Sequence, residues 1–421
     1  MAAASGGAAV AYAFATLAKL AQEHGDAYYV IDVDRFRANL RALAGAFRAI
    51  YPRTAIGYSY KTNYTPVLCR VADAEGCYAE VVSKMEYDLA LRVGVSPHRV
   101  IFNGPLKAPE ELEEALLAGA LVNVDSATEL DAVEALARRR PDARLRVGVR
   151  CHLSLADGHL SRFGIASEGP ELHTVCARLR ALPQCALQGL HCHFSSYRGL
   201  ESFRARAEKL VELAREHFPD APPAALDIGG GFFGSMPETL RAQFEGGVPS
   251  FSDYARAVAP VFAAAFPGDG APELLLEPGV GVVADAIDFV CRVAALKRLG
   301  ERRLAVTTGS IQNLKATPHA RTLPMRVVRD QTADGRATLP GPVVITGYTC
   351  MESDVLHLGY PGELGIGDFL VFHNAGAYTS VFKPPFIQPA PAMLSYLATQ
   401  KTFTVARRRE NLEDLLSTYV V

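Results

Sequence analysis

The feature of this sequence that most restricts its fold is a regular alternation of short apolar runs with longer helix-like stretches. Eight runs of strand length are found at Ala55–Tyr60, Tyr78–Ser83, Val100–Asn103, Leu121–Asp125, Leu145–Arg150, Leu187–His193, Ala225–Ile228 and Leu274–Glu277. Stretches with a helical period lie between them, at Met85–Val93, Pro109–Ala118, Ala127–Arg138, Pro170–Ala181, Glu201–His217 and Phe251–Phe266. This alternation predicts a parallel sheet covered by helices, and eight units indicate a closed (β/α)8 barrel.

The chain is longer than one barrel, since its 421 residues exceed the roughly 250 that such a barrel takes. After Ala286 the helix-like stretches stop, and strand-like runs separated by Gly, Pro and Asp turns follow at Phe289–Leu296, Leu304–Thr308, Gly341–Thr346 and Asp368–Phe372. Another strand-like run, Ala27–Val33, precedes the barrel. We therefore predict an α/β barrel over residues 34–285 and an all-β domain, of sandwich or barrel type, built from residues 1–33 and 286–421.

Charge and cysteine usage narrow the class of partner. The 43 Lys and Arg against 45 Asp and Glu leave a formal net charge of -2, so the chain has no basic field for nucleic acid or an anionic membrane. It contains no apolar run long enough to span a bilayer, and its eight cysteines form no C-x-x-C pair. The Ala-rich start also lacks the basic residues of an export signal. We expect a cytoplasmic protein whose partners are small molecules.

The carboxyl ends of the predicted strands are where a barrel of this kind holds its reactive residues. Lys61 directly follows the first strand. A lysine beside apolar walls loses ammonium character and can serve as the nucleophilic amine of Schiff-base chemistry. Position alone favours the ordinary alternative, a surface lysine whose head group stays in water.

Three further strand ends carry polar or glycine residues. His191 and His193 share one side of the sixth strand, as barrel-interior groups or as half of a metal site, but no carboxylate lies nearby in sequence and we predict no metal. Gly229–Gly231 end the seventh strand, where successive backbone N–H groups make a concavity suited to phosphate. Glu277 ends the eighth strand, and its ordinary alternative is a solvated acid.

An amine, a ring-stacking histidine, a phosphate cradle and a carboxylate at one barrel mouth together outline a site for pyridoxal 5'-phosphate. Lys61 would hold the aldehyde of the cofactor as an aldimine. Glu277 would keep the pyridine nitrogen protonated, so that the ring withdraws electrons from a carbanion at Cα.

At these positions the sequence resembles the fold-type III pyridoxal-phosphate-dependent decarboxylases, which include the diaminopimelate, ornithine and arginine decarboxylases. The resemblance spans Tyr28–Phe386 and rests on Y-S-Y-K-T-N at 58–63, G-L-H-C-H-F-S-S at 189–196, L-D-I-G-G-G-F at 226–232 and E-P-G at 277–279. It implies that Lys61 forms the Schiff base and that the following residues bind or support the cofactor: Glu80, Arg150, His193, Ser196, Gly229, Gly230, Gly231, Glu277 and Tyr378.

The resemblance also gives the second domain a role in a homodimer with shared active sites. Gly347–Asp354 is similar to a G-x-x-C-x-x-x-D segment whose cysteine enters the site of the partner subunit, which implies a catalytic role for Cys350. Tyr378 belongs to a G-A-Y segment whose tyrosine contacts the phosphate. Ser161-Arg162-Phe163-Gly164 resembles S-K-F-G, so that Arg162 would pair with Asp354 across a two-fold interface.

Two departures from the family pattern concern the cofactor and the substrate. Val280 replaces an arginine that contacts the phosphate, which predicts weaker cofactor affinity. Met351 replaces the acid with which diamine-forming members recognise a distal amine. The loop Gly309–Pro318 is more similar to siderophore-pathway relatives, which decarboxylate a citrate-conjugated diamino acid. We predict decarboxylation of an α-amino acid or conjugate other than simple lysine or ornithine, with Lys315 and Asp354 in substrate binding.

Three alternatives stay open at this point. They are a diaminopimelate decarboxylase proper, an amino-acid racemase on the same cofactor, and a catalytically inactive decarboxylase-like regulator. The G-x-x-C-x-x-x-D segment favours decarboxylation over racemisation. Retention of Lys61, Glu277 and Cys350 argues against an inactive protein.

Overall fold

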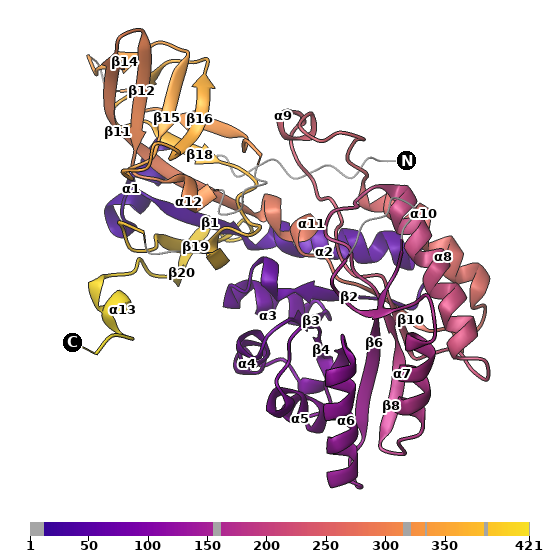
Figure 1. Ribbon diagram of the computed structural model, residues 1–421. Coiled ribbons are helices and arrows are strands. Elements are labelled where there is room, and N and C mark those ends of the chain that lie inside the picture. The colour runs from indigo at the N-terminus through magenta and orange to yellow at the C-terminus, as the bar shows by residue number, and fades with distance from the viewer. Residues whose placement is uncertain (1–11, 155–160, 315–320, 333–334, 383–385, 421) are drawn as a thin grey trace. The chain divides into compact units, whose positions relative to one another are not determined.

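A computed structural model describes residues 12–154, 161–314, 321–332, 335–382 and 386–420 (Figure 1). The chain divides into two compact units. One unit consists of Arg37–Gly234 and Gly246–Val282, and the other of the residues up to Phe36, Ser235–Glu245 and the residues from Val283 onward.

Eight parallel strands close the first unit into a barrel. In order around the barrel they are β2 (Thr54–Ser59), β3 (Tyr78–Val81), β4 (Val100–Phe102), β5 (Leu121–Val124), β6 (Leu145–His152), β8 (Cys185–His191), β9 (Ala225–Asp227) and β10 (Glu273–Leu276). Pairing of β10 with β2 and of β5 with β6 completes the circle, while the short β7 (Ile165–Ala166) extends from β6. The predicted (β/α)8 barrel is confirmed.

The barrel is a packed core because its strands are covered on both faces. Every residue of β2 is buried, as the continuous apolar run in its sequence predicts. Ala55, Ile101, Leu121 and Leu275, from four different strands, form one buried apolar cluster.

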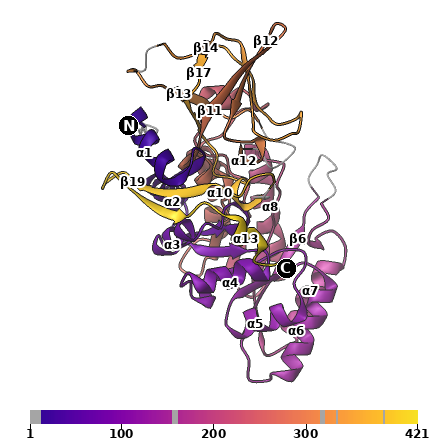
Figure 2. The same ribbon diagram turned by 90° about the vertical axis from the view of Figure 1, so that its left-hand side faces the viewer.

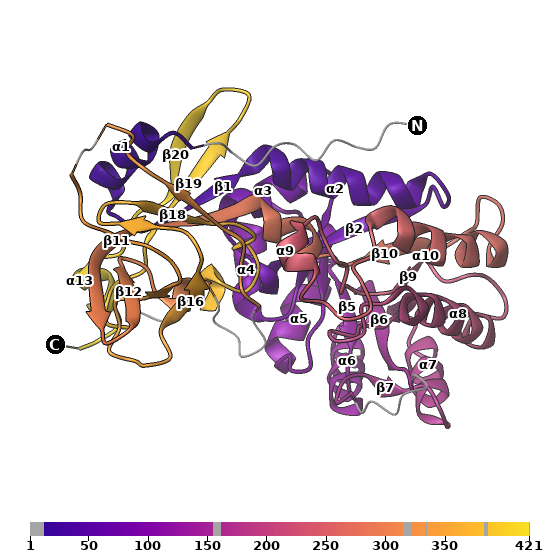
Figure 3. The same cartoon turned by 90° about the horizontal axis from the view of Figure 1, so that it is seen from above.

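Helices alternate with these strands. They are α2 (Val33–Arg48), α3 (Pro66–Ala74), α4 (Lys84–Arg92), α5 (Pro109–Leu117), α6 (Ala127–Arg139), α7 (Glu171–Arg180), α8 (Leu200–His217) and α10 (Phe251–Ala265). Figure 3 shows α8 and α10 lying side by side. The sequence analysis did not predict α2 or α3, although Phe36, Leu40, Leu43 and Phe47 of α2 are buried at helical spacing.

The second unit is built on a sheet, as predicted. Its strands follow the order β16 (Val355–Tyr360), β15 (Val343–Thr346), β12 (Arg302–Thr307), β11 (Ile287–Leu299), β1 (Tyr28–Asp32), β19 (Ala392–Leu397) and β20 (Thr402–Arg407). β18 (Phe369–Phe372) pairs with β11 and with β13 (Met325–Val328). β14 (Thr338–Leu339) pairs with β17 (Leu364–Gly365), and both are labelled in Figure 2. The N-terminal strand β1 lies between β11 and β19.

Helix α1 (Phe14–His24) packs on this sheet. Its Leu17 and Leu20 join a buried cluster with Tyr28, Val290 and Leu394. Four short helices complete the elements used below: α9 (Glu238–Arg241), α11 (Val280–Val283), α12 (Ile311–Leu314) and α13 (Leu412–Leu416). Within the described parts of the chain, no helix has the length and apolar character needed to cross a membrane. A cytoplasmic location stays a prediction.

Candidate active site

Lys61 lies at the mouth of the barrel because a short turn, Tyr60–Thr62, follows β2 without a break. Its Nζ lies 2.5 Å from Oε2 of Glu80. Glu80 belongs to β3, and its side chain is fully buried. Glu80 also accepts hydrogen bonds from Ser59 Oγ and from Asn103 Nδ2, the latter at 3.1 Å. A buried carboxylate thus holds the amine predicted to form the Schiff base, while 28% of the Lys61 side chain stays exposed.

Glu277 follows β10 directly and is buried. Asn103 Nδ2 donates to its Oε1 at 2.6 Å, and His191 Nε2 lies 3.3 Å from its Oε2. Asn123 Nδ2 in turn donates to Asn103 Oδ1 at 2.8 Å. Asn103 therefore connects the carboxylate beside Lys61 with the carboxylate at the end of the last strand.

Glu277 and its neighbour Asp227 have opposite pKa shifts. Burial alone would raise the pKa of Glu277, but the charges of His191 and Lys61 outweigh burial and hold that pKa below its ordinary value. Burial first, and then the negative charge of Glu277, raise the pKa of Asp227 well above its ordinary value. The pair therefore combines an ionised carboxylate with a neutral acid, and the ionised one suits a protonated ring nitrogen.

The same groups also satisfy the distance requirement for a metal, since ligand atoms of His191, Asp227 and Glu277 lie within 4.8 Å of one another. One oxygen of each carboxylate already accepts an N–H, since Asn103 donates to Glu277 Oε1 and Gly229 N donates to Asp227 Oδ1 at 2.7 Å. The prediction of no metal is kept.

The glycine loop after β9 has a backbone that requires glycine. Gly229 and Gly231 have φ values of +68° and +102°, in the left-handed region. A Cβ on Gly230 would overlap the carbonyl oxygen of Glu277, and Glu277 N donates to Gly229 O at 2.9 Å. The loop is thereby fixed against the end of β10.

His193 lies against the same loop. Gly230 N donates to its Nδ1 at 3.0 Å, so that the hydrogen of the neutral ring is on Nε2. Burial, together with the positive charge of Lys61, lowers the pKa of His193 well below its ordinary value. A neutral, fixed imidazole is suited to stacking on a flat ligand.

A cavity of about 190 Å³ adjoins His193. It is lined by Ser161, Arg162, Phe163, His193, Phe194, Ser195, Ser196 and Tyr197. The guanidinium groups of Arg150 and Arg162 lie 4.6 Å and 4.2 Å from the centre of the Phe163 ring. Arg150 also pairs with Asp125 at 3.3 Å. The predicted residues His193 and Ser196 are therefore brought together on one cavity.

The predicted residues of the second unit are found on its loops. Cys350 is exposed, and Tyr378 has a φ of +55°. Asp354 is buried and accepts hydrogen bonds from Ile311 N at 2.7 Å and from Thr349 N at 3.0 Å, which fasten two loops of this unit to each other. Lys315 lies outside the described residues. The functional roles of these residues and of Arg162 stay predictions.

Sequence reasoning missed several members of the site. Asn103 and Asp125 directly follow β4 and β5, so the rule that selected Lys61 and Glu277 at strand ends applies to them equally. Asn123 and Asp227 lie inside the predicted strands. Arg206 of α8 carries no such signal.

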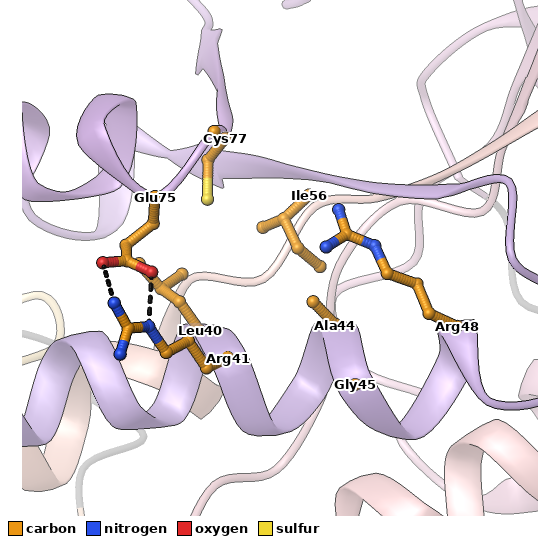
Figure 4. A pocket seen from close by; sticks show the side chains of 9 residues that line it. Leu40, Arg41, Ala44, Gly45, Arg48, Ile56, Glu75 and Cys77 are labelled. Atoms are coloured by element: carbon orange, nitrogen blue, oxygen red, sulfur yellow. Dashed lines mark hydrogen bonds and ion pairs between the residues drawn. The ribbon is translucent and has the colours of Figure 1, made fainter.

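Another cavity, of about 170 Å³, lies on the outside of the barrel (Figure 4). Arg41 on one side of it binds both carboxylate oxygens of Glu75, at 2.6 Å and 2.9 Å. Cys77 precedes β3, at the opposite end of the strands from Lys61, and burial raises the pKa of its thiol to about 12. This cavity contains none of the strand-end residues, so it is not the candidate active site.

Comparison with known proteins identifies the family. The family described as "Pyridoxal-dependent decarboxylase, pyridoxal binding domain" matches residues 37–284. The diaminopimelate decarboxylase of Actinosynnema pretiosum subsp. auranticum is 31% identical over 94% of this chain and 90% of its own length. That of Methanothermobacter thermautotrophicus is 28% identical over 94% of this chain and 92% of its own length.

Solved structures share the fold. A diaminopimelate decarboxylase from M. jannaschii has a TM-score of 0.84 at 22% identity, with 96% of this chain and 94% of that chain covered. Another structure from that organism is a co-complex with L-lysine, with a TM-score of 0.82.

The residues of the barrel mouth fit the cofactor of this family. Lys61 would supply an amine, Glu277 an ionised carboxylate for the pyridine nitrogen, and the Gly229–Gly231 loop the N–H of Gly231, on a backbone that leaves no room for a Cβ. The chain belongs to the pyridoxal-dependent decarboxylases, and its cofactor is pyridoxal phosphate.

Proposed function

We propose that this enzyme decarboxylates an α-amino acid whose distal end carries a carboxylate, either free or as part of a conjugate, and that Lys61 bonds the cofactor. The observation that carries the proposal is the pairing at one barrel mouth of Lys61 with Glu80 and of Asn103 with the ionised Glu277. When bound, the cofactor withdraws electrons from the bond at Cα that releases CO2.

The residues of the chain have separate tasks in this proposal. Glu80 fixes the Lys61 amine and returns it to one position after each turnover. Glu277 keeps a negative charge at the ring nitrogen, and His193 covers one ring face as a neutral imidazole. The Gly231 N–H and the Ser196 hydroxyl bind the phosphate, because Gly229 N and Gly230 N already donate to Asp227 and His193.

We further propose that the active enzyme is a homodimer in which Cys350 of one subunit reaches the site of the other. The exposed position of Cys350 supports this role, since it leaves the thiol available to a second chain. Cys350 would return a proton to Cα after CO2 has left. Tyr378 would contribute to phosphate binding from the same domain.

The substrate class rests on the second unit. Met351, with 43% of its surface exposed, offers no charge to a distal amine, which disfavours simple ornithine or lysine. Lys315 and Asp354 stay the proposed substrate residues, although the buried hydrogen bonds of Asp354 favour an indirect role for it. Diaminopimelate is the second candidate. The names of the relatives favour it, and it meets the distal-carboxylate requirement.

CO2 release from a panel of amino acids tests the proposal. The panel contains meso-diaminopimelate, citryl-conjugated diamino acids, ornithine and lysine, at equal concentrations. We expect the fastest release from a substrate with a distal carboxylate, at least about 100-fold above ornithine, because an uncompensated charge at a specific site costs several kcal/mol. Fastest turnover of ornithine or lysine would contradict the substrate class.

The same reactions separate the rival functions. A racemase would change the enantiomer ratio of the recovered amino acid without releasing CO2. An inactive regulator would do neither. Lys61→Ala serves as the control for background release.

A further inference from the structure

Arg206 is a fully buried arginine with no carboxylate partner. It lies on α8, has no exposed surface, and forms no ion pair with any Asp or Glu among the described residues. Its guanidinium lies 4.3 Å and 4.9 Å from the ring centres of Phe203 and Phe194. Aromatic faces compensate a buried cation only in part, so the charge of Arg206 is unusual for the interior of a protein.

The hydrogen bonds of Arg206 go to the two segments that surround the proposed phosphate site. Nη1 donates to Gly230 O at 3.3 Å, in the middle of the glycine loop. Nη2 donates to Tyr197 O, one residue after Ser196, and to Ser202 Oγ at 3.2 Å. One guanidinium therefore fixes both the loop after β9 and the segment after β8.

The bond to Gly230 O sets the direction of the next amide. The peptide between Gly230 and Gly231 is planar and trans, so its N–H points away from the side on which its carbonyl meets Arg206. Gly231 N has no protein acceptor among the described residues, and the φ of +102° at Gly231 is one that few other residues adopt. The amide is thus held as a free donor on the face of the loop opposite Arg206.

The positive charge of Arg206 persists at neutral pH. Burial lowers its pKa to about 10, and the nearby Arg198 acts in the same direction, while the groups that raise it are Cys192 and Tyr254. None of these neighbours is a carboxylate. An anion bound on the other side of the glycine loop would supply the missing negative charge.

We propose that Arg206 is a positioning residue for the cofactor, which orients the Gly231 amide and provides a buried counter-charge for the phosphate. The inference rests on the proposed placement of the phosphate at Gly229–Gly231. Arg206 acts through Gly230 and Tyr197 rather than by contact with the phosphate. A role confined to packing against Phe194 and Phe203 is the competing explanation.

The test compares two aldehydes that differ only in the phosphate. Apoenzyme is titrated with pyridoxal phosphate and with pyridoxal, and each Kd is obtained from the absorbance of the Schiff base. The measured quantity is the ratio of the pyridoxal Kd to the pyridoxal phosphate Kd. Arg206→Met should lower this ratio by about 10-fold or more, since it removes a charge-assisted interaction. Arg204→Met, an exposed neighbour on α8 that pairs with Glu208, is the control and should leave the ratio unchanged.

An unchanged ratio in Arg206→Met, with both ligands weakened equally, would overturn the proposal in favour of packing. If Arg206→Met does not fold, the Kd ratio of Arg206→Lys decides between positioning and packing. Lysine keeps the charge but lacks the planar guanidinium that donates to both carbonyls, so the Kd ratio should fall by about 3-fold. An unchanged ratio would again overturn the proposal. Wild-type enzyme that binds the two aldehydes equally would instead contradict the proposed phosphate site itself.

Discussion

At the residue scale, Glu277 shows how a barrel keeps a buried carboxylate ionised. Desolvation opposes its charge, but His191 and Lys61 together overcome that cost. Asn103 adds a hydrogen bond of 2.6 Å to the charged oxygen. The neighbouring Asp227 takes up the proton instead, because two adjacent buried acids do not both ionise.

Replacement of Glu277 by Gln should therefore lower kcat by about 100-fold or more, because the ring nitrogen loses the charge that keeps it protonated. Steady-state CO2 release measures the effect, and absorbance confirms that the variant is loaded with cofactor. Glu273→Gln, at the amino end of the same strand, is the matched control and should retain activity. Equal activity of Glu277→Gln and wild type would show that Glu277 does not face the ring.

A substitution at Val280 is predicted to tighten cofactor binding. It begins α11 directly after E-P-G, at the position where the family pattern that this sequence resembles has an arginine. Val280→Arg should tighten pyridoxal phosphate binding by about 10-fold, since a charge-assisted hydrogen bond contributes on the order of 1.5 kcal/mol. Equilibrium titration of the apoenzyme measures this change, with Val280→Met as a control for size. No difference between Arg and Met at this position would mean that the side chain does not reach the phosphate.

Residues at strand ends were predictable from sequence, and residues that act through others were not. Lys61 and Glu277 follow apolar runs that could only be strands, so their place at the mouth followed from the barrel. Arg206 lies in the middle of an amphipathic helix, where nothing in the sequence distinguishes it from a solvent-exposed arginine. Its burial depends on Phe194 and Phe203, whose positions only the folded chain defines.

At the element scale, α4 and α6 begin in the same way. Ser83 Oγ and Ser126 Oγ accept hydrogen bonds from the backbone N–H of Glu86 and of Glu129, three residues later. Each glutamate then accepts a hydrogen bond at 2.8 Å from the residue before its serine. The two acids differ in their partners, because Glu129 pairs with the buried Lys107 at 2.9 Å.

This difference predicts opposite effects of the same substitution. Burial raises the pKa of Glu86 to about 7 from 4.5, so the stability that its protonated form contributes is present below pH 4.5 and is lost as the pH rises through 7. The free energy of unfolding of Glu86→Gln, relative to that of wild type, should therefore rise by about 2–3 kcal/mol between pH 5 and pH 8. Glu129→Gln should instead lose about 3 kcal/mol at pH 7, because it leaves the Lys107 charge buried without its carboxylate.

Denaturant unfolding of the apoenzyme at several pH values measures both effects. A pH-independent difference between Glu86→Gln and wild type would contradict the pKa assignment of Glu86. Stability of Glu129→Gln equal to that of wild type would show that Lys107 finds another partner or loses its proton.

The elements of the barrel were more predictable than those of the second unit. Buried parallel strands read as apolar runs, and short connections fix their order around the barrel. The sheet of the second unit places β1, from the start of the chain, between β11 and β19. Such pairing over hundreds of residues leaves no local signal, so the presence of the β domain was predictable and its strand order was not.

At the scale of the whole molecule, the proposed homodimer makes a quantitative prediction. Lys61→Ala and Cys350→Ala should each be nearly inactive alone. If each site takes Lys61 from one chain and Cys350 from the other, a mixed dimer has one intact site. Random exchange of the two variants should restore about one quarter of wild-type activity, as expected for a symmetric two-chain assembly.

CO2 release after unfolding and joint refolding of the two variants measures this complementation. Each variant refolded with itself is the control. If light scattering shows dimers but the mixture recovers no activity, the homodimer proposal is contradicted. Lys61 and Cys350 would then act in a site of one chain, or Cys350 would have no part in the mechanism.

The covalent bond between Lys61 and the cofactor is the central claim, and borohydride reduction followed by peptide mass spectrometry tests it most directly. Lys107 is the natural competitor, since its side chain is buried and burial lowers its pKa. The account predicts that the reduced pyridoxyl group is attached to Lys61 and that Lys61→Ala abolishes the label. A label on Lys107, or one that survives Lys61→Ala, would contradict it.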